Sequence, residues 1–284
     1  MSLRENHRPE PVAVVLLHGL CGTADELLPL EGALHAAGFA PCRAFVEGYS
    51  YGGPEGAARP WQEWVDSVAA LAGGLRARHG RVVLAGLSAG AALALATAMQ
   101  GAPVDGLVLM STTLRFDGWA VPAHHWLLPL ALYTPLGRFW RYRERPPYGV
   151  KNERVRRWVE RELQTRRVSA AGAAVIGVPH LREHDRLRRS VLRRLGAFAC
   201  PPALALHARE DEIAGPSNVA LLSARLRTPS FRAVLVEDSH HMITIDNDRA
   251  RVAREVVGFV SALAAPAPSP VPSTAPSAGE PCHA

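Results

Sequence analysis

The sequence predicts an α/β fold with a mostly parallel, doubly wound sheet and a helical lid inserted into it. Continuous apolar runs at 12–17 and 82–87 are typical of strands buried on both faces of a parallel sheet. Helical patterns alternate with such runs, which implies right-handed crossovers between parallel strands. A hydrophobic content of 48% in 284 residues supplies a sizeable core and excludes a disordered or fibrous chain.

The expected elements follow one another in a regular order. After the first strand at 12–17 we expect a helix at 23–37, ended by Gly38, and a weaker strand at 40–46. Further strands are expected at 82–87, 104–110, 203–207 and 232–236, and further helices at 61–78, 88–100, 217–226 and 249–263.

One long stretch interrupts this alternation. Residues 112–195 exceed a plain connection, and they carry a Trp- and Leu-rich segment followed by Arg-rich helical sequence. We interpret them as a lid or cap inserted into a core of residues 12–111 and 196–264. Residues 1–11 form a polar N-terminal segment. We expect the Pro-rich tail at 265–284 to be disordered, because it has almost no large apolar side chains to bury.

Charge and hydropathy narrow the classes of function. The net charge is +6, and residues 138–194 hold 17 Arg or Lys against 6 Asp or Glu. No nucleic-acid-binding motif accompanies this charge, so we expect no nucleic-acid partner. No apolar run approaches the roughly 18–20 residues that span a bilayer, and the polar start lacks the apolar region of a secretory signal. We therefore expect a cytoplasmic protein.

The four cysteines are scattered along the chain. They form no C-x-x-C pair, which predicts neither a disulfide scaffold nor a metal site. They are Cys21, Cys42, Cys200 and Cys282.

The motif Gly86-Leu87-Ser88-Ala89-Gly90 is the strongest functional signal. It has the G-x-S-x-G form and lies directly between a predicted buried strand and a predicted helix, the context that a nucleophile elbow requires. Small residues two positions either side of the serine permit the tight turn, and the helix N-terminus favours developing negative charge. The alternative is a glycine-rich turn with a capping serine. We predict that Ser88 is a nucleophile.

Serine is a poor nucleophile until a general base removes its proton, and that base is a histidine oriented by a carboxylate. In this fold class the chain order is serine, acid, histidine. Asp211, in an acidic loop after a predicted strand, is the candidate acid, with Glu210 and Glu212 as alternatives. His241, in the loop after the last strand, is the candidate base, and His240 is the alternative.

Acyl transfer also needs two hydrogen-bond donors for the oxyanion of its tetrahedral intermediate. One candidate is the backbone N–H of Ala89, which follows the nucleophile. The other is the N–H of Leu20, in the loop after the first strand, and the Leu20 side chain would then line the acyl pocket. Asp246 either supports the histidine-bearing loop or, equally well, enters the last helix.

Four motifs together resemble those of a known family. They are HGLCG (18–22), GLSAG (86–90), AREDEI (208–213) and SHHMITID (239–246). With them the chain resembles an α/β-hydrolase of the bacterial carboxylesterase and monoacylglycerol lipase group, over about residues 11–111 and 200–263. The last motif is similar to that group's S-G-H-x-I-T-x-D, which places the histidine of the site at His241. Ala91 and His240 stand where the group has glycine.

The resemblance implies hydrolysis of small-molecule carboxylic esters through an acyl-enzyme, without a metal or organic cofactor. Ser88 would attack the carbonyl, His241 would carry the proton, and Asp211 would orient the imidazole. Alternatives on the same triad are a thioesterase, C–C hydrolase, acyltransferase or peptidase. A non-catalytic binding protein of this fold is a further, less favoured alternative.

The apolar part of the predicted lid bears on the substrate. Trp119 and Trp126 lie in it, and such a stretch could contact an acyl chain or make a weak contact with a lipid surface. The alternative is that these side chains only pack the lid onto the core. We expect Trp119 and Trp126 to bind substrate, in a pocket for short to medium acyl chains.

Overall fold

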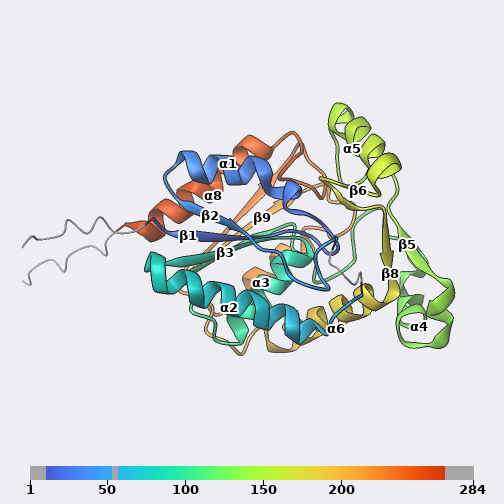
Figure 1. Cartoon of the computed structure of the whole chain (residues 1–284), viewed down its shortest axis with the longest axis horizontal. Coiled ribbons are helices and arrows are strands. Elements are labelled where there is room, and N and C mark those ends of the chain that lie inside the picture. The colour runs from blue at the N-terminus through green and yellow to red at the C-terminus, as the bar shows by residue number, and fades with distance from the viewer. Residues whose placement is uncertain (1–10, 53–56, 266–284) are drawn as a thin grey trace, which may run out of the picture.

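A parallel sheet of six strands runs through the part of the chain that the computed structural model describes, residues 11–52 and 57–265 (Figure 1). Its order is β10-β9-β4-β3-β1-β2. The chain leaves β1 towards one edge and returns to its other side at β3, so the sheet is doubly wound, as predicted. The strands are β1 (Ala13–Leu17), β2 (Ala40–Arg43), β3 (Val82–Leu87), β4 (Gly106–Met110), β9 (Ala203–Ala208) and β10 (Phe231–Val236).

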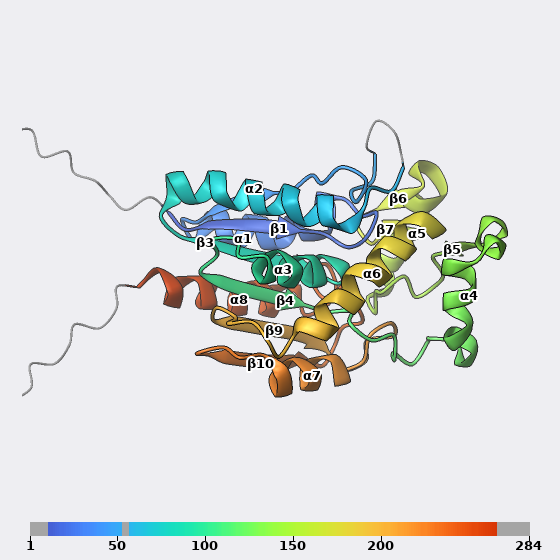
Figure 2. The ribbon, with the colours of Figure 1, turned by 90° about the horizontal axis from the view of Figure 1, so that it is seen from below.

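Helices cover both faces of this sheet (Figure 2). One face is covered by α1 (Leu28–Ala36) and α8 (Arg249–Ala264), which contact each other. The other face is covered by α2 (Trp61–His79), α3 (Ala89–Met99), α6 (Val178–Arg194) and α7 (Ser217–Arg225). No described helix is both long enough and apolar enough to cross a bilayer.

The side chains of β1 explain why its sequence is apolar throughout. Val15 and Leu17 belong to the core cluster under α2 and α3, whereas Val14 and Leu16 belong to the cluster under α1 and α8. Successive residues of a strand point to opposite faces, so a strand covered on both sides has no polar face. The apolar runs therefore predict the central strands correctly.

The predicted helix at 23–37 is divided in the structure. A 3₁₀ turn, η1 (Ala24–Leu27), precedes α1, which begins at Leu28. Pro29 lies in the first turn of α1, where its missing N–H leaves no helical hydrogen bond unmade. The chain consequently starts a new helix just before this proline.

Most of the segment between β4 and α6 gathers at one end of the molecule (Figures 1 and 2). It contains two antiparallel strand pairs, β5 with β8 and β6 with β7, that the sequence does not predict because each strand has only two or three residues. Its elements are η2 (Ala123–Leu127), α4 (Leu128–Tyr133), η3 (Pro135–Phe139), β5 (Arg141–Arg143), α5 (Glu153–Arg166), β6 (Val168–Ser169), β7 (Gly172–Ala173) and β8 (Val175–Gly177).

The last part of the predicted lid has a different environment. α6 packs along α3, and its Leu187 and Val191 belong to the core cluster on that face. The lid boundaries at 112 and 195 stay a prediction. The predicted N-terminal segment and proline-rich tail lie outside the described residues, except for Pro11 and Ala265.

The start of α3 lies against the end of β1 with no room for a side chain. A methyl group at Gly90 would overlap the carbonyl oxygens of Leu17 and His18. A methyl group at Gly86 would likewise overlap the carbonyl of Gly90. The two glycines of the G-x-S-x-G motif therefore permit the contact that joins β1, β3 and α3.

We expect Gly90→Ala to lower the free energy of unfolding by roughly 1–3 kcal/mol, because overpacking forces α3 away from β1. Gly73→Ala is the matched control, since an added methyl there, within α2, meets no atom within 4 Å. The control should raise the free energy of unfolding by roughly 0.5–1 kcal/mol, because alanine favours helix over glycine. Urea unfolding followed by circular dichroism measures both, and a Gly90→Ala protein as stable as wild type would contradict this packing.

Candidate active site

Ser88 lies at the apex of a tight turn between β3 and α3. Its backbone has φ 57° and ψ −116°, a conformation that non-glycine residues rarely adopt. Its N–H donates to the carbonyl of Met110 at 2.8 Å, which holds the turn against the end of β4. The serine remains partly exposed between buried neighbours, so its hydroxyl is accessible at the carboxyl edge of the sheet.

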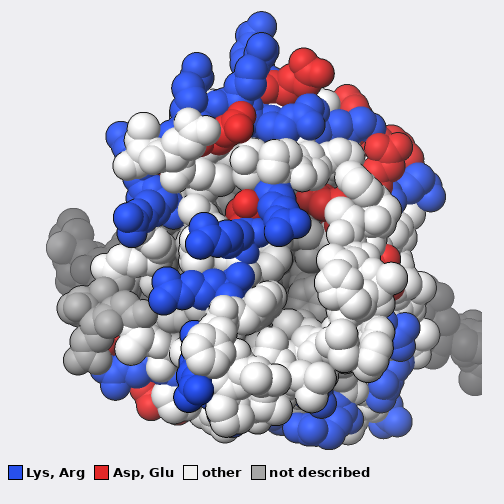
Figure 3. Space-filling view, turned by 90° about the vertical axis from the view of Figure 1, so that its right-hand side faces the viewer, with Lys and Arg blue, Asp and Glu red and all other residues white. Residues whose placement is uncertain are grey.

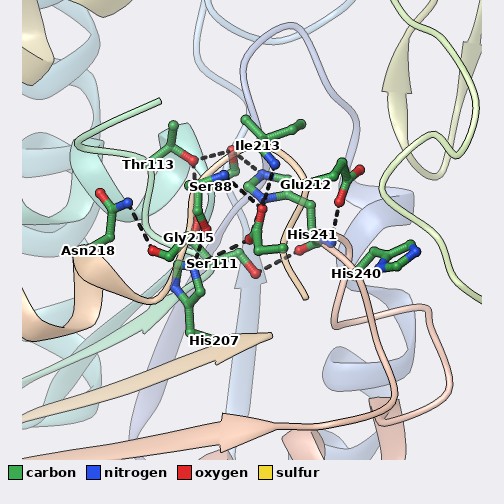
Figure 4. A network of polar contacts seen from close by, with 12 residues as sticks. Ser88, Ser111, Thr113, His207, Glu212, Ile213, Gly215, Asn218, His240 and His241 are labelled. Carbon is green, nitrogen blue, oxygen red and sulfur yellow. Dashed lines mark hydrogen bonds and ion pairs between the residues drawn. The ribbon is translucent and has the colours of Figure 1, made fainter. Parts of the chain in front are cut away.

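A continuous chain of hydrogen bonds links Ser88 to His241 and Asp211 (Figure 4). His241 Nε2 lies 2.8 Å from Ser88 Oγ, and His241 Nδ1 lies 2.7 Å from Asp211 Oδ2. The other carboxylate oxygen, Asp211 Oδ1, accepts the N–H groups of Ile213 at 2.9 Å and Ala214 at 2.8 Å. The three side chains follow β3, β10 and β9, whose carboxyl ends meet at one edge because the strands are parallel.

The alternative acids lie in other positions. Glu210 is exposed and forms an ion pair with Lys151 at 2.9 Å. Glu212 is buried and accepts the backbone N–H of His241 at 3.1 Å. Of the three neighbouring carboxylates, only Asp211 contacts the imidazole of His241 among the hydrogen bonds of the described residues.

The neighbouring histidine points away from Ser88 (Figure 4). The His240 ring donates from Nδ1 to the carbonyl of Glu210 at 3.0 Å and lies edge-on to Trp119. Its backbone N–H donates to Asp246 Oδ2 at 2.9 Å. The structure thus brings His241, and not His240, between Ser88 and Asp211.

Charge around the imidazole favours its protonated form. Burial by itself would lower the pKa of His241, but the charge and hydrogen bond of Asp211, together with Glu212 and Glu144, raise it to about 9. Burial likewise opposes ionisation of Asp211, yet His241, His207 and the Ala214 N–H hold its pKa below the usual value. The pair can therefore hold an imidazolium, the species that forms when the base takes a proton.

Three further carboxyl groups surround this pair, and sequence reasoning did not single out two of them as part of the site. Burial raises the pKa of Glu26 to about 8. Burial and the charge of Glu212 raise the pKa of Glu144 to about 7. Burial and Asp211 raise the pKa of Glu212. Glu26 gives no sequence signal, because an acidic residue in the first turn of a helix is common.

Glu26 joins two loops of the site. Its carboxylate accepts the N–H of Gly19 at 2.6 Å, and its backbone carbonyl accepts the hydroxyl of Thr244 at 2.6 Å. A methyl group at Gly22 would overlap this carboxylate. Glu26 therefore fixes the loop after β1 relative to the loop that carries His241.

The loop after β1 lies close to the start of α3, because Gly90 contacts the carbonyl oxygens of Leu17 and His18. In the part of the chain that the structure describes, the N–H groups of Leu20 and Ala89 have no hydrogen-bond partner. Tyr49 holds this loop from behind, since its hydroxyl donates to the His18 carbonyl at 2.6 Å and its carbonyl accepts the Cys21 N–H at 3.0 Å. The sequence predicts these two N–H groups as oxyanion donors, and this role stays a prediction.

His18, in the same loop, is neutral and structural. Burial lowers its pKa to about 4. Its Nδ1 lies 2.7 Å from the Gly19 carbonyl, which can only accept, so Nδ1 carries the proton. Nε2 then accepts the Ser50 hydroxyl at 2.8 Å, which leaves His18 no free nitrogen to act as a base.

Asp246 supports the loop that carries His241. Its buried carboxylate accepts the N–H groups of Lys151 at 2.7 Å, Asn152 at 2.8 Å and His240 at 2.9 Å. The Ser111 hydroxyl donates to the His241 carbonyl at 2.6 Å from the end of β4. Helix α8 starts beyond this loop, at Arg249, so Asp246 acts as a loop support.

The expected substrate-binding residues lie in different surroundings. Leu20 is partly buried and packs against Cys21 and Ile176. Trp119 is 62% exposed and its Nε1 donates to the Glu210 carbonyl at 3.0 Å. Trp126, in η2, is 70% exposed. Across the described ranges, no cluster of three or more His, Cys, Asp or Glu side chains could hold a metal ion.

Several known proteins resemble this chain in sequence or in fold. The chain is 25% identical over 249 residues to a thermostable monoacylglycerol lipase from Bacillus sp. (strain H-257), which covers 88% of this chain and 90% of the relative. The structure of a Paleococcus ferrophilus monoacylglycerol lipase superimposes with a TM-score of 0.72 at 19% identity, over 90% of this chain and 96% of the other.

A soluble variant of monoglyceride lipase from Saccharomyces cerevisiae, solved with a substrate analog, superimposes with a TM-score of 0.74 at 13% identity, over 91% of this chain and 88% of the other. At such identities these two structures show a common fold. The sequence profile of the Alpha/beta hydrolase family matches residues 14–255, which is most of the chain. The chain therefore belongs to the α/β hydrolase family.

Proposed function

We propose that this protein is a serine hydrolase that cleaves carboxylic esters through an acyl-enzyme. The observation that carries this proposal is the chain of hydrogen bonds from Ser88 through His241 to Asp211. The Bacillus monoacylglycerol lipase, with 25% identity over most of both chains, supports the ester as substrate class.

The proposed reaction has two halves. His241 Nε2 takes the proton of Ser88 Oγ while that oxygen bonds to the ester carbonyl carbon. The carbonyl oxygen becomes an oxyanion and accepts the N–H groups of Leu20 and Ala89. Collapse breaks the bond to the alcohol oxygen, which takes the proton from His241. Water then attacks the acyl-serine by the same route and releases the carboxylic acid.

Asp211 stabilises the charged intermediate of this cycle. It accepts the Nδ1–H of His241, so Nε2 is the nitrogen left free to face Ser88. Its two hydrogen bonds from backbone N–H groups keep the carboxylate fixed while the imidazole gains and loses a proton.

For the substrate we propose a short to medium acyl chain next to Leu20, under a lid formed by residues 112–195. Exposed apolar side chains of this segment could make a weak contact with a lipid surface. Those between residues 119 and 140 are Trp119, Trp126, Leu127, Leu130, Tyr133, Leu136, Phe139 and Trp140.

Ser88→Ala should abolish labelling by a fluorophosphonate probe and lower kcat for p-nitrophenyl butyrate by about 10³-fold or more, because the nucleophile is lost. Ser67→Ala, at an exposed serine of α2, is the control and should behave as wild type. His241→Ala should match Ser88→Ala, whereas His240→Ala should retain most activity. Intact-mass detection of the adduct checks the first variant, and a labelled Ser88→Ala protein would refute the assignment.

The pH dependence follows from the pKa of His241. Below that pKa the imidazolium cannot accept the Ser88 proton. The value of kcat/KM should therefore rise with pH, and the midpoint of this rise should lie near pH 9. Glu144→Gln removes a negative charge that stabilises the imidazolium, and should move the midpoint to lower pH by roughly 0.5 pH unit or more. Glu153→Gln, at an exposed position of α5, is the charge-matched control. An unchanged profile in Glu144→Gln would contradict this coupling.

The acyl pocket can be measured with p-nitrophenyl esters from acetate to palmitate. We expect kcat/KM to be highest between butyrate and decanoate and to fall at palmitate, because added methylenes gain free energy only while they fit within the pocket. A series that keeps rising through palmitate would instead indicate an open channel for long chains.

A further inference from the structure

A large cavity opens beside the loop that carries Leu20. Its volume is about 1320 Å³, above the 300–1,000 Å³ that is typical of small-molecule sites. Cys21, directly after Leu20, forms part of its wall. The rest of the wall includes residues 57–59, most residues of 47–52, several of 134–143 and the start of α6. Figure 3 looks onto this end of the molecule and shows a hollow with Lys and Arg side chains gathered beside it.

The wall of this cavity is strongly basic. Its one carboxylate among the described residues, Glu47, pairs with Arg59 at 3.0 Å. The side chains of Arg141, Arg143 and Arg167 form no ion pair with any described residue. The six arginines that line the cavity are Arg59, Arg138, Arg141, Arg143, Arg167 and Arg182.

The β5–β8 pair directs two of these guanidinium groups to the same side. Tyr142 pairs with Ile176 and packs inward beside Cys21. Side chains alternate along a strand, so Arg141 and Arg143 both leave the opposite face, and both are exposed. Two positive charges two residues apart on one strand repel each other, and an anion bound between them would relieve this repulsion.

One more arginine is held by the inserted segment. Arg182, near the start of α6, donates from Nε to the backbone carbonyl of Leu132. This contact orients the guanidinium without neutralising its charge. Guanidinium groups bind phosphate oxygens through paired N–H donors, and several of them match a doubly charged phosphate better than a single carboxylate.

We propose that this cavity binds the phosphate of the substrate, so that the preferred ester joins an acyl chain to a phosphorylated alcohol. The acyl carbonyl would lie at Ser88, and the alcohol half would pass Cys21 towards Arg141 and Arg143. This inference rests on the proposed ester hydrolysis for the reaction, but the phosphate site itself can be measured without any turnover.

The direct test is calorimetric titration of the full-length protein with octyl phosphate. Arg141→Gln/Arg143→Gln should weaken binding by about tenfold or more, as expected for the loss of charge-assisted hydrogen bonds at an exposed site. Arg251→Gln/Arg254→Gln removes the same charge from exposed positions of α8 and should bind as wild type. Thermal unfolding checks that both variants fold. Equal binding by wild type and Arg141→Gln/Arg143→Gln would overturn the proposal.

Two further titrations identify the source of the phosphate. Inorganic phosphate should bind more weakly than octyl phosphate, because only octyl phosphate has an alkyl chain that can contact apolar side chains of the cavity wall. Binding to phosphatidylglycerol vesicles that depends on Arg141 and Arg143, with no binding of octyl phosphate, would overturn the substrate site and assign the arginines to a membrane surface.

Steady-state kinetics distinguishes a failure of the proposed phosphate site from a failure of the proposed ester hydrolysis. With 1-octanoylglycerol and its 3-phosphate below their critical micelle concentrations, the wild type should prefer the phosphate ester by about tenfold in kcat/KM, and the Arg141→Gln/Arg143→Gln variant should lose this preference. Hydrolysis of both esters at equal rates by both proteins would overturn the phosphate site and leave the esterase intact. Arginine-dependent binding of octyl phosphate without hydrolysis of any ester would support the site and overturn the reaction.

Discussion

The close approach of α3 to the end of β1 is the contact on which the rest of the site depends. Gly90 lies against the carbonyl oxygens of Leu17 and His18 at the end of β1, and this contact holds the neighbouring turn at Ser88, which has a positive φ. The same contact sets the distance between Ala89 and the Leu20 loop. One backbone contact thus fixes the turn that carries Ser88 and Ala89 against the loop that carries Leu20.

Local signals predicted the parts of the fold that repeat a simple pattern. The apolar runs of β1 and β3 predict strands because both faces of the sheet are covered. The G-x-S-x-G motif predicts a turn because only small residues fit two positions from Ser88. Chain order predicted Asp211 and His241 as candidates, with Glu210, Glu212 and His240 as alternatives. In the structure, His241 contacts both Ser88 and Asp211.

Features that depend on long-range contacts were not predictable in this way. Glu26 is an ordinary helix-start residue in the sequence, and its burial between two loops arises only when β1 and the His241 loop meet. Strands β5 and β8 are three residues each, too short for a pattern, and they pair across more than thirty intervening residues. The basic segment predicted charge but gave no indication that its arginines would share one cavity.

The hydrogen bonds of Asp246 divide the inserted segment into two parts that differ in how freely their residues can be substituted. This carboxylate ties Lys151 and Asn152 to the backbone of His240, so the chain near 151 is anchored to the His241 loop. Elements η2, α4 and η3 precede that anchor and carry most of the exposed large apolar side chains of the inserted segment. Evolution or design can therefore exchange residues 119–140 to alter which substrates enter the site, while the hydrogen bonds of Asp246 preserve the position of His241.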